Sequence, residues 1–86
     1  MSVRAQVMEI IDGDTFKTDN TIRLQGVYAP ELSERGGSEA KRKLASLIAD
    51  KEVTYEEKAR DTYGRILARV WVDSVDVNAT MKRYLG

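Results

Sequence analysis

The hydrophobic pattern of this chain changes period twice, and this switch limits the folds that the chain can adopt. Strand-like spacing comes first, in short segments separated by turn signals. A segment with helical spacing follows, with apolar residues at Ala40, Leu44, Leu47 and Ile48, and strand-like spacing then returns. The predicted strands are residues 3–11, 15–18, 21–26, a segment that begins at Val53, and 66–72; the predicted helix is residues 38–50.

The order of these segments predicts a mostly β fold with one or two helices. Short turns at 12–14 and 19–20 join the first three strands as antiparallel neighbours. Three strands, a helix and two strands are the order of a five-stranded OB-fold, a Greek-key barrel with its helix between strands 3 and 4. Residues 78–85 can form a final helix. With 86 residues, we expect a single domain over 1–86.

Composition narrows the chemistry that the chain can carry. The chain contains neither cysteine nor histidine, which excludes disulfides and argues against zinc, but an oxygen-ligated cation such as calcium fits. Fourteen basic residues balance fourteen acidic ones, so any contact with nucleic acid should be local. No apolar run approaches a membrane span, and no signal-peptide core follows the first residues, so we expect no membrane partner.

Each polar motif has an ordinary structural explanation when it is taken alone. Asp12-Gly13-Asp14 is a strong turn signal, and Arg23 can be an outward-facing strand residue. Glu31, after Pro30, can be a solvated loop acid, and Arg65 can simply flank a turn.

Taken together, these motifs resemble the staphylococcal nuclease (thermonuclease) family over nearly the whole chain. The matching segments, in the family's order, are IIDGDTFK at 10–17, IRLQGVYAPE at 22–31, the helix opening GSEAKRKL at 37–44, DTYGRILARVWV at 61–72 and DVNATM at 76–81. The resemblance independently implies the OB-type barrel.

The resemblance implies calcium-dependent hydrolysis of phosphodiester bonds in DNA and RNA. Matching positions imply calcium binding by Asp14 and the main-chain oxygen of Ala29, scissile-phosphate binding by Arg23 and Arg65, a water-activating role for Glu31, and a nucleotide-phosphate contact for Tyr63. Elementary chemistry agrees, because guanidinium groups pair with phosphate oxygens in bidentate fashion. Without histidine, a carboxylate is the available base. We expect a nucleic-acid partner and a monomer.

Two departures from the family pattern leave alternatives open. Tyr28 stands where the family has a second calcium-binding Asp, so weaker calcium binding is expected. The chain also lacks, as given, the family's C-terminal extension, which contributes a further tyrosine. The first hypothesis is therefore a nuclease, with activity limited by Tyr28. The alternative is a nucleic-acid-binding module with impaired catalysis, and a purely structural barrel comes third because it would not need these charged residues. The sequence leaves open the substrate preference and the compartment.

Overall fold

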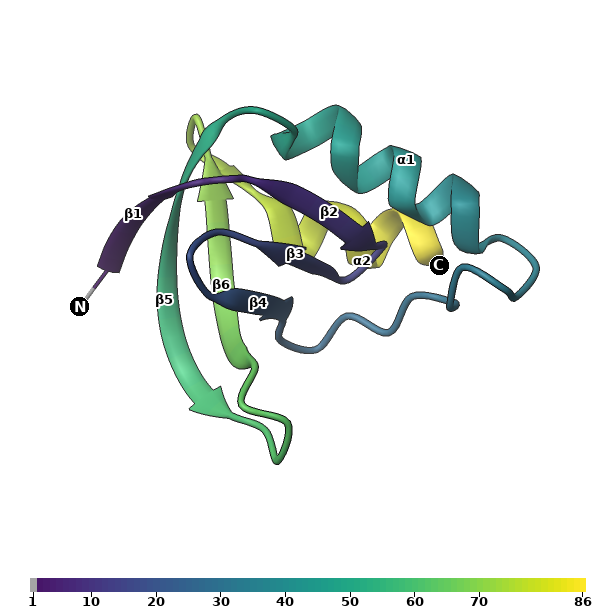
Figure 1. The fold of residues 1–86 in the computed structure, drawn as a ribbon. Helices are drawn as coiled ribbons and strands as arrows, with labels where there is room; N and C mark the ends of the chain where they lie inside the picture. The colour runs from purple at the N-terminus through teal and green to yellow at the C-terminus, as the bar shows by residue number, and fades with distance from the viewer. Residues whose placement is uncertain (1) are drawn as a thin grey trace.

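A computed structural model describes residues 2–86 of the chain and confirms a mostly β protein with two helices (Figure 1). The elements, in chain order, are β1 (Ser2–Gln6), β2 (Glu9–Asp12), β3 (Thr15–Lys17), β4 (Thr21–Leu24), α1 (Gly37–Ile48), β5 (Glu52–Arg60), β6 (Ile66–Val72), β7 (Val75–Asp76) and α2 (Val77–Leu85). Neither helix in this range is long and apolar enough to cross a membrane.

The strands form one mixed sheet with the order β1-β5-β6-β4-β3-β2, and β7 pairs with β6. All strand pairs are antiparallel except β4 and β6, which run parallel. The two ends of this order, β1 and β2, are consecutive in the chain and are separated only by Val7 and Met8. The sheet is therefore strongly curved, and one continuous segment supplies both of its edges (Figure 1).

The predicted strand 3–11 is divided into β1 and β2 because the chain changes its pairing partner in the middle. β1 pairs with β5, and the N–H of Val7 still donates to the carbonyl of Lys51 beside β5. The next N–H, that of Met8, donates instead to the carbonyl of Lys17, and β2 pairs with β3. This change of partner and the two-residue β7 bring the observed number of strands to seven rather than the predicted five.

The core lies between the curved sheet and the two helices. Along β6, alternate residues are buried, as a strand with one face toward the core requires. Helix α1 buries Ala40, Leu44 and Ile48 on one face, as its spacing predicted. The fully buried large side chains of the core are Phe16, Ile22, Leu24, Val27, Leu44, Ile48, Val53, Ile66, Val70, Val77 and Met81.

Helix α2 is fastened to the sheet by polar groups as well as by its apolar face. Asp76 caps its first turn by accepting a hydrogen bond from the N–H of Ala79. The buried Asn78 accepts from the N–H of Val70 and donates to the carbonyls of Ala68 and Gln25. Since all of these partners are backbone groups of β6 or of the segment after β4, Asn78 fixes the helix against both.

Candidate functional site

The first part of the site is the turn between β2 and β3, which buries the carboxylate of Asp14. Only 6% of Asp14 is exposed. Its Oδ1 accepts from the hydroxyl of Thr15 at 2.8 Å, and its Oδ2 accepts from the N–H of Ala29 at 3.0 Å and from Nη2 of Arg23 at 3.4 Å. One carboxylate therefore joins the turn, strand β4 and the loop after β4.

Asp12 places a second carboxylate beside this group. Its Oδ1 accepts from the N–H of Asp14 at 3.1 Å. Burial raises the pKa of Asp12, and the side chain and negative charge of Asp14 raise it further; the hydrogen bond from the N–H of Asp14 lowers it by less, so the pKa is raised overall. Two adjacent acidic groups with this mutual repulsion form a donor set that suits an oxygen-ligated cation. Residues 2–86 hold no cluster of three acidic, histidine or cysteine side chains, so further ligands would be main-chain oxygens, water or substrate.

Arg23 lies on β4 beside this turn, since Thr15 of β3 is its register partner. Its guanidinium is largely buried, and Nη2 donates to the carbonyl of Val27 at 3.1 Å as well as to Asp14. The ring of Tyr28 covers the same guanidinium, with 5.2 Å between Cζ and the ring centroid. Three contacts therefore hold Arg23 in one orientation before any ligand arrives.

Arg65 immediately precedes β6 and is brought to the same side of the sheet as Arg23. In the parallel β4–β6 pair, Ile22 faces Ile66 and Arg23 faces Leu67. Arg65 is one residue before β6, and its carbonyl accepts from the N–H of Asp61, which continues the β5–β6 pairing; its backbone position is therefore expected on the face of Leu67 and Arg23. The register therefore brings the backbone positions of two arginines from distant parts of the sequence to adjacent strands of the sheet.

Asp61 orients Arg65, and sequence analysis did not single it out. Its Oδ2 accepts from Nε of Arg65 at 2.6 Å, while its Oδ1 accepts from the N–H groups of Tyr63 and Arg65. Desolvation raises the pKa of Asp61, but hydrogen bonds from Arg65 and Tyr63 outweigh it, so the pKa is lowered overall. The sequence feature that could have identified Asp61 as the partner of Arg65 is the four-residue spacing between them within one turn.

An exposed tyrosine ring contacts the guanidinium group of each of the two arginines. Tyr63 is 84% exposed, and its ring centroid lies 5.5 Å from Cζ of Arg65. Tyr28 is 79% exposed and stacks on Arg23 as described above. Arginine–tyrosine stacking keeps the guanidinium planar face covered while its N–H edge remains able to bind an anion.

Glu31 lies on the loop between β4 and α1, two residues after Ala29, which binds Asp14. The side chain is exposed, and within residues 2–86 its carboxylate accepts no hydrogen bond. Its backbone is held firmly: the N–H donates to Oε1 of Glu34 at 2.7 Å, and the carbonyl accepts from the N–H of Glu34 at 2.9 Å. The carboxylate is thus solvated but mounted on an ordered turn.

Two glycines allow this loop and helix α1 to approach the site closely. The sequence indicated Gly13 as part of a turn and Gly37 as the start of the helix, but it did not indicate these close contacts. A Cβ on Gly37 would lie 1.9 Å from the carbonyl oxygen of Glu31. A Cβ on Gly13 would lie 2.6 Å from Cβ of Ala40 and 2.8 Å from Cβ of Ala29. Any larger residue at either position would push apart the turn of Asp14, the loop of Glu31 and the start of α1.

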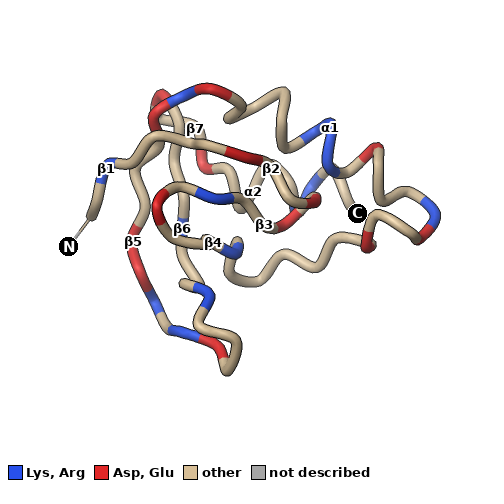
Figure 2. The backbone as a smooth tube through the Cα atoms, viewed as in Figure 1, with Lys and Arg blue, Asp and Glu red and all other residues tan. Residues whose placement is uncertain are grey.

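The charge around the site is local. Basic and acidic residues are interspersed along the backbone (Figure 2), in keeping with the formal net charge of zero. Arg23 and Arg65 are each partly neutralised by an aspartate, at 3.4 Å and 2.6 Å respectively. The arrangement offers two preoriented guanidinium groups, the buried carboxylate of Asp14 beside the partly buried one of Asp12, and the solvated carboxylate of Glu31; such groups can bind and polarise a phosphate group.

Comparison with known proteins identifies similar chains. Residues 21–84 match the family model described as Staphylococcal nuclease homologue. The chain is 38% identical over 76 residues to Protein ParB of Escherichia coli, covering 83% of this chain and 43% of the relative. It is 36% identical over 87 residues to an uncharacterized endonuclease of Escherichia coli (94% and 57%), and 38% identical over 73 residues to micrococcal nuclease of Shigella flexneri (79% and 42%). The chain spans about half the length of these curated relatives.

Proposed function

Because this chain belongs to the staphylococcal nuclease homologue family, we propose that it is a nuclease that hydrolyses phosphodiester bonds of DNA or RNA. Relatives named as endonuclease and micrococcal nuclease support this proposal. The observation that supports it most is the parallel pairing of β4 and β6, in which Arg23 faces Leu67, two residues after Arg65, while Arg23 also donates to the buried Asp14.

The two arginines would bind the scissile phosphate and stabilise the charge that develops on it. Attack by water adds negative charge to the non-bridging oxygens, and guanidinium groups pair with those oxygens more strongly as the charge grows. Because Val27 and Tyr28 hold Arg23, and Asp61 and Tyr63 hold Arg65, neither group must reorganise during the reaction.

Glu31 would accept the proton of the attacking water. The chain has no histidine, and Glu31 is a solvated carboxylate on an ordered turn close in sequence to Ala29. Tyr63, exposed beside Arg65, would contact a nucleotide phosphate of the substrate. One chain supplies all of these residues, so we propose that the protein acts as a monomer.

We further propose calcium, or another divalent cation, as the cofactor. Asp14 and the main-chain oxygen of Ala29 would hold the ion, and Asp12 stands close enough to Asp14 to share it. When bound, such a cation supplies positive charge to the phosphate oxygens. Its affinity depends on the number of charged ligands, so with Tyr28 in place of a carboxylate the affinity should be modest.

The observed order of strands and helices is compatible with the predicted five-stranded barrel. If β1 and β2 are counted as one bent strand and β7 as a short addition, the order becomes three strands, α1 and two strands. We propose that the curved sheet is the five-stranded OB-type barrel, with the nuclease site on its outer face.

The test is cleavage of single-stranded DNA with and without calcium, in the wild type and in matched variants. Arg65→Lys should lower the cleavage rate by about 100-fold or more, because lysine cannot reproduce the bidentate fork. Glu31→Gln should lower it by roughly 100-fold, since an amide cannot accept the proton. The control Arg4→Lys, at an exposed ion pair on β1, should match the wild type.

One observation favours a second function, a nucleic-acid-binding module with impaired catalysis. Tyr28 supplies an aromatic ring where a carboxylate would otherwise assist a cation. Wild-type protein that binds single-stranded DNA through Arg23 and Arg65 but cleaves none at any calcium concentration would establish the binding module and overturn the nuclease. Cleavage that is equally fast in Glu31→Gln would instead overturn the role of Glu31.

A further inference from the structure

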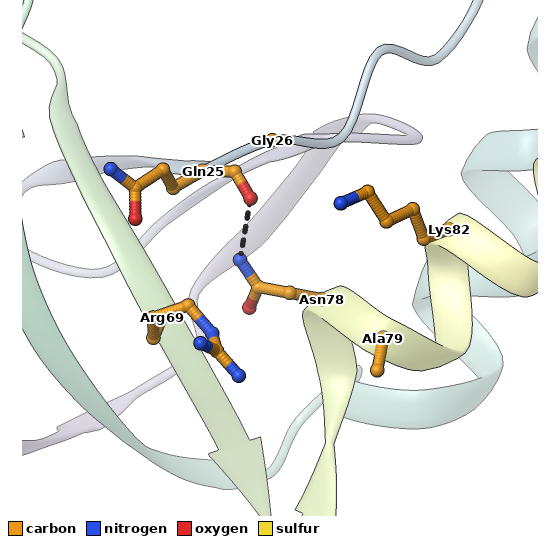
Figure 3. A pocket seen from close by; sticks show the side chains of 6 residues that line it. All are labelled: Gln25, Gly26, Arg69, Asn78, Ala79 and Lys82. Carbon is orange, nitrogen blue, oxygen red and sulfur yellow. Dashed lines mark hydrogen bonds between the residues drawn. The ribbon is translucent and has the colours of Figure 1, made fainter.

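A half-open cavity of about 350 Å³ lies between β6, α2 and the segment that follows β4 (Figure 3). Its lining residues are Gln25, Gly26, Arg69, Asn78, Ala79 and Lys82. None of these residues belongs to the site described above. The volume is within the range of cavities that accept small ligands or parts of larger ones.

The polar groups of the cavity favour an anion. Lys82 extends from α2 toward the opposite wall (Figure 3), and a Cβ on Gly26 would lie 3.7 Å from its Nζ. Within residues 2–86, Lys82 forms no ion pair. An ammonium group at a cavity wall without a carboxylate partner attracts anions.

Arg69 adds a second cation whose hydrogen bonds are incomplete. Its Nη2 donates to Oδ2 of Asp76 at 2.5 Å, and its Nε is buried without an acceptor in the described part of the chain. The other oxygen of Asp76 is occupied by the N–H of Ala79. Lys82 and Arg69 thus line the cavity, and Asp76 is the carboxylate hydrogen-bonded to Arg69. Glu56 faces Arg69 in the β5–β6 register but is itself paired with Lys58, and the amide of Asn78 is engaged by backbone groups.

A second, smaller cavity adjoins this one on the side of Tyr28. It measures about 240 Å³ and shares Gly26 and Lys82 with the first cavity. Its other lining residues include Val27, whose carbonyl accepts from Arg23, and Tyr28, whose ring covers Arg23. Tyr28 therefore lies between the two groups of cations, since it contacts Arg23 and lines a cavity that also contains Lys82.

We propose that the cavity at Lys82 and Arg69 is a second phosphate-binding site. It binds a backbone phosphate of a single-stranded nucleic acid at some nucleotides' distance from the scissile phosphate. The inference rests on the proposed function, since it takes the same substrate. A base of the intervening nucleotides stacks on Tyr28, because aromatic rings along a basic groove bind unpaired bases irrespective of sequence. Tyr28 therefore has a positioning role in place of the missing carboxylate.

The experiment measures binding of fluorescent dithymidylate and octathymidylate in EDTA, so that cleavage does not interfere. Lys82→Ala should weaken octathymidylate binding and reduce the slope of log affinity against log salt by about 0.7, the value for one phosphate contact on a single strand. The loss should be larger for the octamer than for the dimer. Tyr28→Ala should weaken octamer binding roughly 5- to 100-fold, and Tyr28→Phe should restore it.

Lys51→Ala is the matched control, because Lys51 is an exposed lysine that lines neither cavity. Octamer binding that is equal in Lys82→Ala, Lys51→Ala and wild type, or wild type that binds no oligonucleotide, overturns the second site. Inorganic phosphate that displaces dimer and octamer equally in wild type and Lys82→Ala would also overturn it. Cleavage assays test the proposed nuclease activity separately. If binding depends on Lys82 but the protein cleaves no DNA, the second site is supported and only the proposed reaction is overturned.

Discussion

Tyr28 is the residue that most alters what the site can do. Both oxygens of the neighbouring Asp14 already accept hydrogen bonds, from Thr15, Ala29 and Arg23. A cation at Asp14 would thus have to compete with Arg23, and a tyrosine ring offers no charge to help it. The ring instead covers the guanidinium of Arg23 at 5.2 Å. This position therefore offers an aromatic surface and no charge.

Tyr28→Asp should therefore tighten calcium binding, on the order of tenfold, and raise the rate of single-stranded DNA cleavage. The added carboxylate brings both charge and a ligand oxygen. Calorimetric titration with calcium and initial cleavage rates measure the two effects, and Tyr28→Asn controls for removal of the ring without added charge. Glu31→Gln in the Asp background should abolish most of the gain in rate. If Tyr28→Asp and Tyr28→Asn bind calcium equally, a carboxylate at this position does not reach the ion.

At the scale of elements, the packing of the Glu31 loop against the start of α1 fixes the position of the Glu31 backbone, and hence of the candidate base. Helix α1 begins at Gly37, directly after Gly36, which has a left-handed φ of 85°. The loop backbone at Glu31 packs so close to Gly37 that no side chain fits between them. The turn of Asp14 meets the same helix through Gly13 and Ala40. Tight helix–loop packing thus connects the carboxylate groups of the site.

Gly37→Ala should destabilise the protein by about 1–3 kcal/mol, because the new Cβ overlaps the carbonyl of Glu31 and the backbone must move. This cost exceeds the gain of about 0.5–1 kcal/mol that alanine normally brings to a helix. Urea unfolding measures the stability, and amide NMR shifts should change most at 31–34. Ser38→Ala, one position later and exposed, is the control and should change the stability by less than about 0.5 kcal/mol. Equal stability of the two variants would show that the loop adapts without cost.

At the scale of the whole molecule, Asp76 couples folding stability to pH. Partial burial raises the pKa of Asp76, but the N–H of Ala79 and the guanidinium of Arg69 lower it by more, so the folded pKa lies below the unfolded value. The contribution of Asp76 to stability is consequently complete above the unfolded pKa of about 3.9 and is lost as the pH falls through the folded pKa. The groups affected are the ion pair between Arg69 of β6 and Asp76 and the cap of α2, so protonation of Asp76 weakens the attachment of α2 to β6.

Asp76→Asn keeps a good helix cap but removes the charge that pairs with Arg69. The variant should be less stable than wild type by up to about 1 kcal/mol at neutral pH, and the difference should vanish near pH 2. Urea unfolding between pH 7 and 2 measures it. The control is Asp50→Asn, at an exposed position with a left-handed φ of 60° that asparagine tolerates. A difference between Asp76→Asn and wild type that persists unchanged at pH 2 would contradict the coupling.

The sequence alone determined the local elements and the family. Period-two and helical spacing depend on neighbouring residues, so the helix α1, the strand β6 and the turns at 12–14 and 61–64 were predictable from the chain itself. The five ordered motifs predicted the staphylococcal nuclease family, to which the chain belongs. The candidate residues Asp14, Arg23, Glu31 and Arg65 were named on the same motifs.

Only the tertiary structure decided which of these local parts meet. The change of partner between Val7 and Met8 divides one predicted strand, and no local pattern records it, because both halves keep strand-like spacing. The parallel β4–β6 register, which brings Arg23 and Arg65 to one face, joins strands more than forty residues apart. The supporting role of Gly37 and the cavity at Lys82 likewise depend on contacts between distant segments. Such contacts follow from how the backbone hydrogen bonds and apolar faces of all elements are satisfied together, a condition that short-range periodicity does not contain.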